Sequence, residues 1–558
     1  MRLIPLFLLS LLLPALPAPA QKSNDSAMGL WPWLVKNVNK DIPKIVADTK
    51  NAGLDTIYVS VFRVKGRMWG SLPVEDESGL WNKSWGTVKP YVKLSTLISR
   101  AHAAGLQVVG VMSCFVPGKV PPTDTAHQRY LVEKVIGYFF DHFRPDGTPW
   151  YDLDGICLDY VRFGSGYRRP SKPVNDFLDR IKARYPWLPL HAYVIANLYS
   201  YDGPVYNNSF RSYSAVVKMI SETFGQNYEQ MASRLDVILP MAYIANGGVY
   251  GSNKTYMKGY VRTVASYVRR AMTIGGSPST KVIVAIQTYG KADSGTVKAS
   301  ASGALAGGAH GFMPFRYYTC KPAWLSVLKS YAVPGPNRPV AGLAFSAQGQ
   351  TMLLDPTLSH DGQDPASKLT LRFDWDGDGR LDTSLLKMGA IQRLAPSPGN
   401  RTIAMQVTDS EGLTAWTRRK IYVPHSLTLS FSMLSASQGG RILFPCHAGP
   451  AGPGLFYLTL GSATGTGPGI SLGGGVQVPL VYDSMTYFTL LLGGSSLFPG
   501  SMGYIPSSGK ISPAFAPGKG VLPPSLAGSK LFFALAFFSP GNFQPQGATN
   551  PVTLYIVP

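Results

Sequence analysis

The chain has 558 residues, which is too long for a single hydrophobic core and predicts several domains. Its formal charge is +21, and its four cysteines (Cys114, Cys157, Cys320 and Cys446) include no C-x-x-C pair. That spacing argues against a zinc site, and four cysteines are too few for a fold held together by disulfides.

Residues 1–20 have the features of a signal peptide. Arg2 precedes an apolar run at 3–13, and Ala18-Pro19-Ala20 provides the small residues of a cleavage site. The run is too short to span a bilayer, and no later stretch is apolar enough for a transmembrane segment. We therefore expect a secreted protein, extracellular or at the cell surface. For an exported chain, the positive charge favours acidic glycans over nucleic acid as partners, with general surface basicity as the alternative.

Strand-like and helix-like segments alternate through the first part of the chain. The strand candidates are short, β-branched and almost continuously apolar, as parallel strands buried on both faces are. They lie at residues 28–34, 56–62, 107–115, 155–163, 190–197, 237–244, 282–289 and 311–318. Eight strand-helix units in about 300 residues predict a (β/α)8 (TIM) barrel over residues 21–333. A doubly wound open sheet is the competing fold.

The rest of the chain predicts β structure. Residues 334–339 are a proline-rich linker, because proline restricts its own φ and that of the preceding residue. Beyond the linker the helical period disappears and short alternating strands follow. We expect two all-β sandwich domains, at residues 340–425 and 426–558. The second is rich in Gly and Pro, and its role is unknown.

The segment Asp374-Trp-Asp-Gly-Asp-Gly-Arg-Leu-Asp382, followed by a strand at 402–407, resembles a polycystic-kidney-disease-type (PKD-like) domain. Such domains are immunoglobulin-like sandwiches found in secreted polysaccharide-degrading enzymes. Oxygen ligands at positions 1, 3, 5 and 9 also fit a structural Ca2+ loop, formed by Asp374, Asp376, Asp378 and Asp382. Position 12, where such a loop carries a glutamate, is Leu385, so a hydrogen-bonded acidic turn is the alternative.

Catalytic groups of (β/α)8 enzymes lie at the carboxyl ends of the strands. Aromatic, amide and arginine side chains dominate these positions here, as a sugar site requires, since sugar rings stack on aromatic faces and sugar hydroxyls need directed hydrogen bonds. The predicted substrate-binding residues are Trp31, Arg63, Tyr160, Arg162, Asn197, Tyr243, Gln287 and Arg316.

The most specific motif is Leu153-Asp-Gly-Ile-Cys-Leu-Asp-Tyr-Val-Arg-Phe163. It resembles the fourth strand of the glycoside-hydrolase-like barrels that carry F-D-x-I-x-F-D-Y-V-R-F, and Pro240-Met-Ala-Tyr243 matches their P-M-x-Y. The resemblance implies that Asp159 is the leading catalytic carboxylate. Chitinases share D-G-I-x-x-D but place their acid glutamate two residues later. Val161 stands there in this chain, which disfavours chitinase-type chemistry.

Strand alternation gives an independent reason to single out Asp159. If its side chain points into the barrel, those of Cys157 and Gly155 do too, and both are small enough for a crowded interior. Asp154 would then point outward and serve a structural hydrogen bond to nearby backbone. The alternative for Asp159 is a structural ion pair with Arg162 or Arg63.

Glycoside hydrolysis ordinarily needs two carboxylates, and the second is harder to find. Strands five to eight end without Asp or Glu. The candidates are expected in loops. Glu75 and Glu77, after the second strand, are the leading pair, and Asp76, Asp202 and Asp293 are weaker candidates.

The sequence thus predicts a secreted glycoside hydrolase, with Asp159 as nucleophile or general base and no required cofactor. Arginine presents a planar fork suited to carboxylate or sulfate, so the arginines near the predicted mouth favour an anionic polysaccharide, uronate-containing or sulfated. The alternative is a non-catalytic carbohydrate-binding or cell-surface protein on a degenerate barrel.

Overall fold

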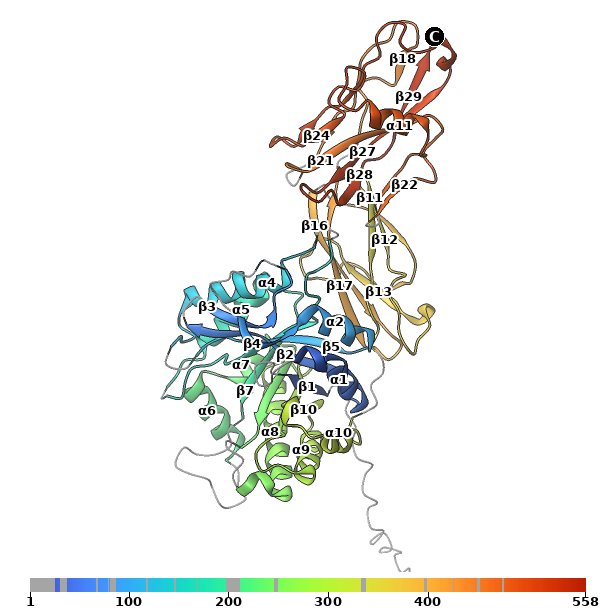
Figure 1. The fold of residues 1–558 in the computed structure, drawn as a ribbon. Helices are drawn as coiled ribbons and strands as arrows, with labels where there is room; N and C mark the ends of the chain where they lie inside the picture. Colours follow the sequence, from blue (N-terminus) through green and yellow to red (C-terminus); the bar gives the residue numbers. More distant parts are fainter. Residues whose placement is uncertain are drawn as a thin grey trace, which may run out of the picture. The chain divides into compact units, whose positions relative to one another are not determined.

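The computed structural model describes residues 26–30, 38–66, 69–78, 80, 87–116, 119–144, 147–166, 168–196, 211–244, 249–332, 338–395, 399–424, 426–448, 452–473 and 476–558. The chain forms two compact units (Figure 1). The first comprises Met1–Val132, Leu153–Ala183 and Leu188–Pro336, and the second Glu133–Asp152, Arg184–Trp187 and Asn337–Pro558. In the described part, no helix is both long and apolar enough to cross a membrane.

The first unit contains a mostly parallel α/β core. Its ten-stranded sheet consists of an added pair, β3 and β4, and eight strands that pair in parallel in chain order. These eight are β1 (Ala27–Leu30), β2 (Thr56–Gly66), β5 (Gln107–Ser113), β6 (Gly155–Asp159), β7 (Leu190–Ile195), β8 (Val237–Ala242), β9 (Lys281–Gln287) and β10 (Gly311–Phe315).

The sheet curls, so that its first and last strands are neighbours. The amide of Phe312 in β10 donates a 3.3 Å hydrogen bond to Oγ of Ser26, just before β1. One buried cluster also takes side chains from all eight strands, which a flat sheet could not bring together. Its members include Ala27, Tyr58, Val109, Cys157, Tyr193, Leu239, Ile283 and Met313.

Helices follow the strands in chain order, and those of the first unit lie around its sheet (Figure 1). They are α1 (Val38–Asn51), α2 (Leu94–Ala103), α3 (Thr125–Tyr130), a π-helical segment (Leu131–Ile136), α4 (Gly137–Phe140), α5 (Lys172–Arg184), α6 (Tyr213–Phe224), α7 (Tyr228–Ala232), α8 (Lys254–Ile274), α9 (Ser294–Ala306) and α10 (Pro322–Leu328). Gly225, with a φ of +71°, ends α6 in the left-handed conformation that favours glycine, so that α6 and α7 are separate helices.

Beyond Phe62 the structure has a hairpin where the sequence suggested a loop. Strand β2 continues to Gly66 and returns antiparallel as β3 (Trp69–Glu75), which pairs with β4 (Thr87–Lys93). The hairpin is tight, since a Cβ at Gly70 would lie 2.3 Å from the ring of Phe62. Glycine at position 70 lets the strand pass over this ring.

The part of the second unit after residue 337 is rich in β structure. A four-stranded sheet has the order β14-β13-β16-β17, and a nine-stranded sheet has the path β15-β12-β11-β28-β27-β21-β24 with β29 and β18 attached. The strands that precede residue 425 are β11 (Ala344–Gln348), β12 (Thr351–Asp355), β13 (Thr370–Asp374), β14 (Leu386–Lys387), β15 (Ile391–Leu394), β16 (Gly399–Thr408) and β17 (Thr414–Val423).

The elements that follow are β18 (Met433–Ser435), β19 (Ile442–Leu443), β20 (Cys446–His447), β21 (Phe456–Ser462), β22 (Ile470–Gly473), β23 (Val476–Val478), α11 (Ser484–Leu491), β24 (Met502–Tyr504), β25 (Lys510–Ile511), β26 (Ala514–Phe515), β27 (Lys530–Phe538), β28 (Pro545–Ala548) and β29 (Val552–Val557). The nine-stranded sheet runs across the boundary expected at residues 425 and 426, because Gln348 of β11 pairs with Ala548 of β28. Two hydrophobic cores lie on either side of that boundary, one around Phe373 and one around Phe533.

Candidate functional site

Asp159 is the last residue of β6 and stands at the carboxyl end of the parallel core. Cys157, two residues earlier on the same strand, belongs to the buried cluster inside the curled sheet. Alternation therefore directs the side chain of Asp159 to the same side. The carbonyl of Asp159 accepts a 2.8 Å hydrogen bond from the amide of Cys114, which ties the strand end to the end of β5. Asp154 accepts a 2.6 Å hydrogen bond from the amide of Val108, the structural role expected for it.

The carboxyl group of Asp159 is partly buried. Burial raises its pKa to about 6, against the opposing effects of the Tyr160 amide, which donates a 2.8 Å hydrogen bond to Oδ1, and of the Arg162 charge. Arg162 itself donates a 3.2 Å hydrogen bond to the carbonyl of Phe163. Near neutral pH, Asp159 therefore exchanges its proton readily, as a group in acid-base chemistry must.

A sharp turn follows Asp159 and presents an aromatic ring. Tyr160 has a φ of +55°, an unfavourable conformation for a residue with a side chain. Its carbonyl accepts hydrogen bonds from the amides of Arg162 (2.8 Å) and Phe115 (3.3 Å), which hold the turn. The side chain of Tyr160 is 39% exposed, and the Arg162 guanidinium lies 4.9 Å from the ring centroid. Ring and cation form a surface beside the carboxyl group.

Three aromatic rings from neighbouring strand ends form a wall. Tyr243, which follows β8, stacks on Phe315 of β10, with the ring centroids 4.9 Å apart and the planes 10° apart. Tyr289, which follows β9, meets both rings edge-on at 5.9 and 6.2 Å. Burial and the charge of Asp159 raise the pKa of Tyr243, so this hydroxyl stays neutral near pH 7. Phe315 was absent from the predicted set, although its place at a strand end could have marked it.

Arginines stand near these aromatic rings. Burial raises the pKa of Tyr160, and the charges of Arg162 and Arg63 oppose this effect. The Arg316 guanidinium lies 6.0 Å from the ring centroid of Tyr289. The structure thus places Arg162 and Arg316 against rings of the candidate site, and the charge of Arg63 acts on the hydroxyl of Tyr160.

The other predicted contacts fall in different places. Gln287 is 2% exposed, and its amide accepts a 2.9 Å hydrogen bond from the amide of Ile244 and donates a 3.0 Å bond to the carbonyl of Tyr289. Gln287 is therefore a buried residue that holds the backbone next to Tyr243 and at Tyr289, two members of the aromatic wall. Trp31, Asn197 and Asp202 lie outside the described residues.

Gln226 has a similar supporting role that the sequence did not suggest. Its buried amide accepts a 2.9 Å hydrogen bond from the amide of Ile195 and donates a 3.2 Å bond to the carbonyl of Tyr193. A single glutamine within a helix-like stretch of sequence gives no signal of this contact.

The acids expected in loops have partners of their own, and Glu75 is the last residue of strand β3, not part of a loop. Oε2 of Glu75 lies 3.9 Å from Nζ of Lys93, and Glu77 accepts a hydrogen bond from the hydroxyl of Ser95 near the start of α2. Asp76 accepts bonds from Ser78, and Asp293 caps α9. Among the described residues, the charged and hydrogen-bonding groups that act on the pKa of Asp159 are Tyr160 and Arg162, and no carboxylate is among them.

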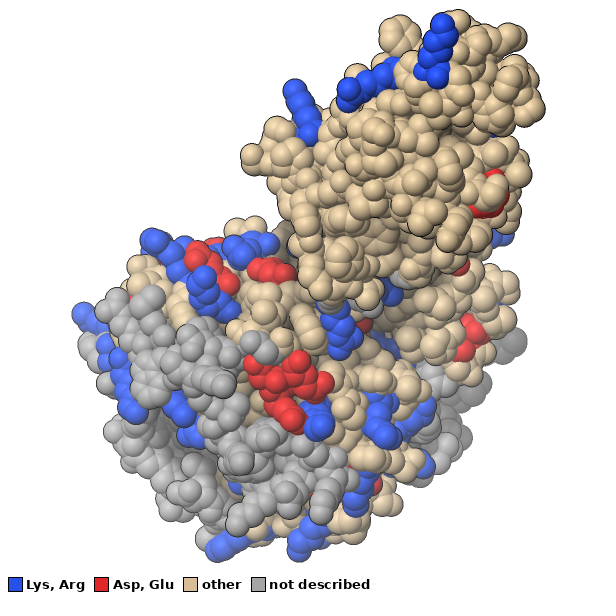
Figure 2. Space-filling model, turned by 45° about the horizontal axis from the view of Figure 1, so that its top comes forward, with Lys and Arg blue, Asp and Glu red and all other residues tan. Residues whose placement is uncertain are grey.

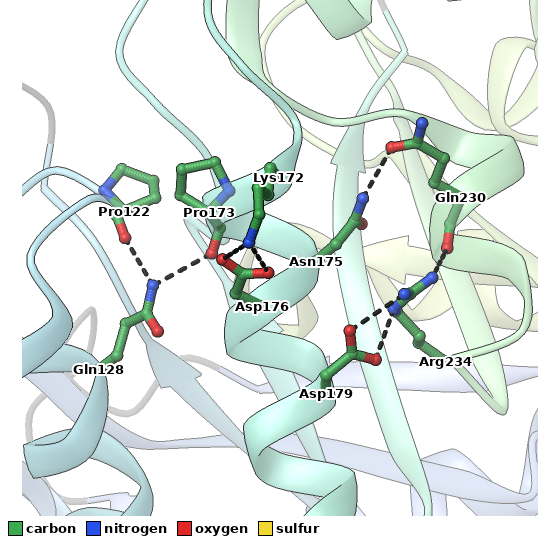
Figure 3. A network of polar contacts seen from close by, with 9 residues as sticks. All are labelled: Pro122, Gln128, Lys172, Pro173, Asn175, Asp176, Asp179, Gln230 and Arg234. Atoms are coloured by element: carbon green, nitrogen blue, oxygen red, sulfur yellow. Dashed lines mark hydrogen bonds and ion pairs between the residues drawn. The ribbon is translucent and has the colours of Figure 1, made fainter.

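A polar network holds α5, the helix that follows the loop after β6 (Figure 3). Gln128 donates to the carbonyls of Pro122 (2.6 Å) and Pro173 (3.1 Å). Asn175 donates a 2.7 Å hydrogen bond to Gln230, and Arg234 binds both oxygens of Asp179 at 2.7 and 3.0 Å. These contacts join α5 to the segment after β5 and to α7 and the residues just after it, so that the helix at the carboxyl-terminal end of the loop bearing Tyr160 and Arg162 is anchored.

The predicted calcium loop brings three of its four carboxylates together. Ligand oxygens of Asp374, Asp376 and Asp382 lie within 4.8 Å of one another. Asp374 is buried, and its carboxylate oxygens accept hydrogen bonds from the amides of Gly377 (2.7 Å) and Gly379 (2.9 Å). Asp378 instead accepts the amide of Arg380. These are hard oxygen donors of the kind that Ca2+ takes, in a turn already held by backbone hydrogen bonds.

No protein-family model and no curated protein matches the chain. Among solved structures, the spore cortex-lytic enzyme SleL of Bacillus megaterium QM B1551 is 12% identical, with a TM-score of 0.38 over 57% of this chain and 76% of that one. A class V chitinase of Pseudomonas fluorescens Pf-5 is 11% identical, with a TM-score of 0.36 over 55% of this chain and 99% of that one. The PKD1 domain of Vibrio anguillarum Epp is 26% identical, with a TM-score of 0.13 over 15% of this chain and 93% of that one. At these TM-scores the likenesses carry no argument about activity or substrate.

Proposed function

We propose that the protein is an exported glycoside hydrolase that acts on a polysaccharide from a closed (β/α)8 barrel, with Asp159 as nucleophile or general base. One observation carries the proposal: a partly buried carboxyl group with a pKa raised to about 6 stands at a strand end near the stacked rings of Tyr243 and Phe315. Aromatic rings suit the faces of a sugar, and the pKa suits proton exchange near neutral pH.

In this proposal Asp159 acts in its ionised form. As a carboxylate it would attack the anomeric carbon or activate a water, and it would stabilise the positive charge that develops on the sugar ring. The neutral hydroxyl of Tyr243 could donate a hydrogen bond to the substrate. A second carboxyl group must protonate the leaving oxygen. Glu75 or Glu77 would have to leave its contact with Lys93 or Ser95 to reach that position.

The arginines support an anionic substrate, uronate-containing or sulfated. Arg63 and Arg162 both act on the hydroxyl of Tyr160, and Arg316 lies over Tyr289. The hydrogen bond of Arg162 goes to a backbone carbonyl, so its charge is available to a ligand.

Carbohydrate binding without cleavage is the second candidate, and the loop acids favour it. Glu75 and Glu77 both contact residues at the start of α2. A barrel that keeps aromatic rings and arginines around one carboxyl group can hold a glycan without the acid that cleavage needs.

The test compares the full chain with its Asp159→Asn variant on neutral, uronate-containing and sulfated polysaccharides, with reducing ends and binding as separate readouts. Asp176→Asn, an exposed acid paired with Lys172, is the matched control. Cleavage that the Asp159 variant loses while it still binds supports the hydrolase. Binding without cleavage by the unmodified chain supports the second candidate, and neither cleavage nor binding overturns both.

A further inference from the structure

Residues 426–558 are almost free of charge. They contain Arg441, Lys510, Lys519 and Lys530 and a single acid, Asp483. Asp483 is used internally, because it caps α11 and accepts hydrogen bonds from Ser462 and Thr464. Most of the exposed large apolar side chains in the described part of the chain lie in this region. Figure 2 shows the contrast, with few blue or red side chains over the mostly tan upper part of the view.

Two of these exposed side chains, Tyr504 and Phe543, form what we term the aromatic face together with the half-buried Phe456 and Phe538. Phe456 of β21 pairs directly with Tyr504 of β24 and with Phe538 of β27, so the three side chains share one side of the sheet. The ring of Phe456 meets those of Tyr504 at 5.5 Å and Phe543 at 5.3 Å, both edge-on. Edge-on packing leaves the outer two rings 59% and 54% exposed while Phe456 supports them.

The loop that carries Phe543 is held in an unfavourable backbone conformation. Phe543 has a φ of +51°, which costs about 1 kcal/mol or more for a residue with a side chain. Hydrogen bonds of its amide to the carbonyl of Ser539 (3.2 Å) and of the Gln544 amide to Asn542 (3.2 Å) hold the turn. The loop thus keeps a large apolar ring in solvent, flanked by two exposed amide side chains.

The chemistry of this surface indicates its ligand. Residues 452–473, 499–505 and 532–548, which carry the aromatic face, contain no Lys, Arg, His, Asp or Glu. Flat rings beside amides, without an ionised group, match a ligand that is uncharged, has flat apolar faces and carries many hydroxyls. An anionic lipid surface would call for adjacent basic residues. We propose that the aromatic face binds the chain of a neutral polysaccharide.

This site consists of other residues than those around Asp159 and extends beyond the proposed hydrolysis. The experiment therefore uses the full chain with Asp159→Asn, so that binding is read without cleavage. Affinity electrophoresis and pull-down would use cellulose, chitin, xylan and β-glucan as probes, with phosphatidylglycerol vesicles as a further arm. Tyr504→Ala and Phe543→Ala are the test variants. Tyr555→Ala, an exposed tyrosine of β29 in the same region, is the matched control.

We expect binding to at least one neutral polysaccharide, about tenfold weaker in each test variant and unchanged in the control. Phe543→Trp should keep the affinity, which separates loss of the ring from misfolding. The proposal is overturned if no probe binds, if the test variants bind as the control does, or if the variants lose only vesicle binding. It is also overturned if the face proves to join two copies of the chain, with the test variants turning a dimer into a monomer.

Discussion

The amide of Tyr160 donates a 2.8 Å hydrogen bond to Oδ1 of Asp159, the residue directly before it. This bond favours the ionised carboxylate, yet burial outweighs it and leaves the pKa at about 6. The left-handed backbone of Tyr160 belongs to the same turn, so the conformation that presents the ring also sets the surroundings of the acid.

Replacing Asp159 by Asn should stabilise the protein at pH 7.5. The pKa of this carboxyl group is about 6 in the folded protein and about 3.9 in the unfolded chain. Its contribution to the free energy of unfolding is therefore fully present below about pH 3.9 and is lost as the pH rises through about 6. Asp159→Asn should therefore match the parent near pH 4 and exceed it by up to about 3 kcal/mol at pH 7.5. Urea unfolding at both pH values measures this. If Asp159 instead formed a structural ion pair, the variant would be less stable at pH 7.5.

Removing the charge of Arg162 should raise the pKa of Asp159 further, because the guanidinium opposes the effect of burial. With Arg162→Gln, the pH at which the Asp159 contribution is lost should move upward, whereas Arg162→Lys should keep it near that of the parent. The measurement is the difference in unfolding free energy between each variant and its Asp159→Asn double variant across pH 4–8. A midpoint that stays in place would show that Arg162 does not act on this carboxyl group.

Asp483→Asn should weaken the region around α11. Burial by itself would raise the pKa of Asp483, but hydrogen bonds from Thr464, Ser462 and the Ala463 amide lower it to about 2. Asn can still cap the helix, so the loss of the charge should cost about 2 kcal/mol at pH 7, as the lowered pKa implies. A group with a lowered pKa loses its contribution as pH falls, so the gap between variant and parent should narrow toward pH 2.

Thermal unfolding at pH 7 and pH 2.5 would measure both effects of Asp483→Asn. Thr464→Val, which removes one hydroxyl donor to Asp483 and leaves the cap in place, should give a smaller loss. Equal losses in the two variants would contradict the role given to the carboxylate.

Millimolar calcium should raise the unfolding temperature of the protein if the loop at Asp374 holds the ion. The three clustered carboxylates supply oxygen ligands, and binding to the folded state alone stabilises it. Asp382→Asn should abolish the shift, and a chelator should reverse it in the parent. Asp378→Asn is the control, since its side chain turns to the amide of Arg380. No shift with calcium in the parent would leave the hydrogen-bonded acidic turn as the correct interpretation.

The strands of the parallel core were the most predictable part of the fold. Those expected to begin at residues 56, 107, 155, 190, 237 and 311 begin there in the structure, because a continuous β-branched run is typical of a strand buried on both faces. Five of these strands end before the predicted residue, because apolar residues such as Phe163 continue after the backbone pairing has stopped. Strand β2 instead runs past its predicted end at residue 62, since it continues into the hairpin. The β2-β3 hairpin was missed because Gly70 and Pro73 suggest a loop until the packing on Phe62 is known.

The candidate site was only partly predictable. Asp159 could be found, because its motif and strand alternation both point to it. The role of Gln287 could not be predicted. Its amide binds the backbone of Ile244, which lies 43 residues away in the sequence, and the backbone of Tyr289, two residues further along the chain. Phe315 was overlooked because one apolar residue at a strand end does not reveal that it stacks on Tyr243. Such contacts depend on tertiary packing, which local patterns do not encode.

The pairing of Gln348 with Ala548 has a consequence for how the molecule assembles. Strand β11 leaves the ribosome long before β28. The end of β11 at Gln348 therefore has no strand partner on that side until nearly the whole chain has been made. Contacts so distant in sequence form slowly, and an open strand edge invites pairing with other chains in the meantime. Shortened chains that lack the last strands should therefore aggregate through β11.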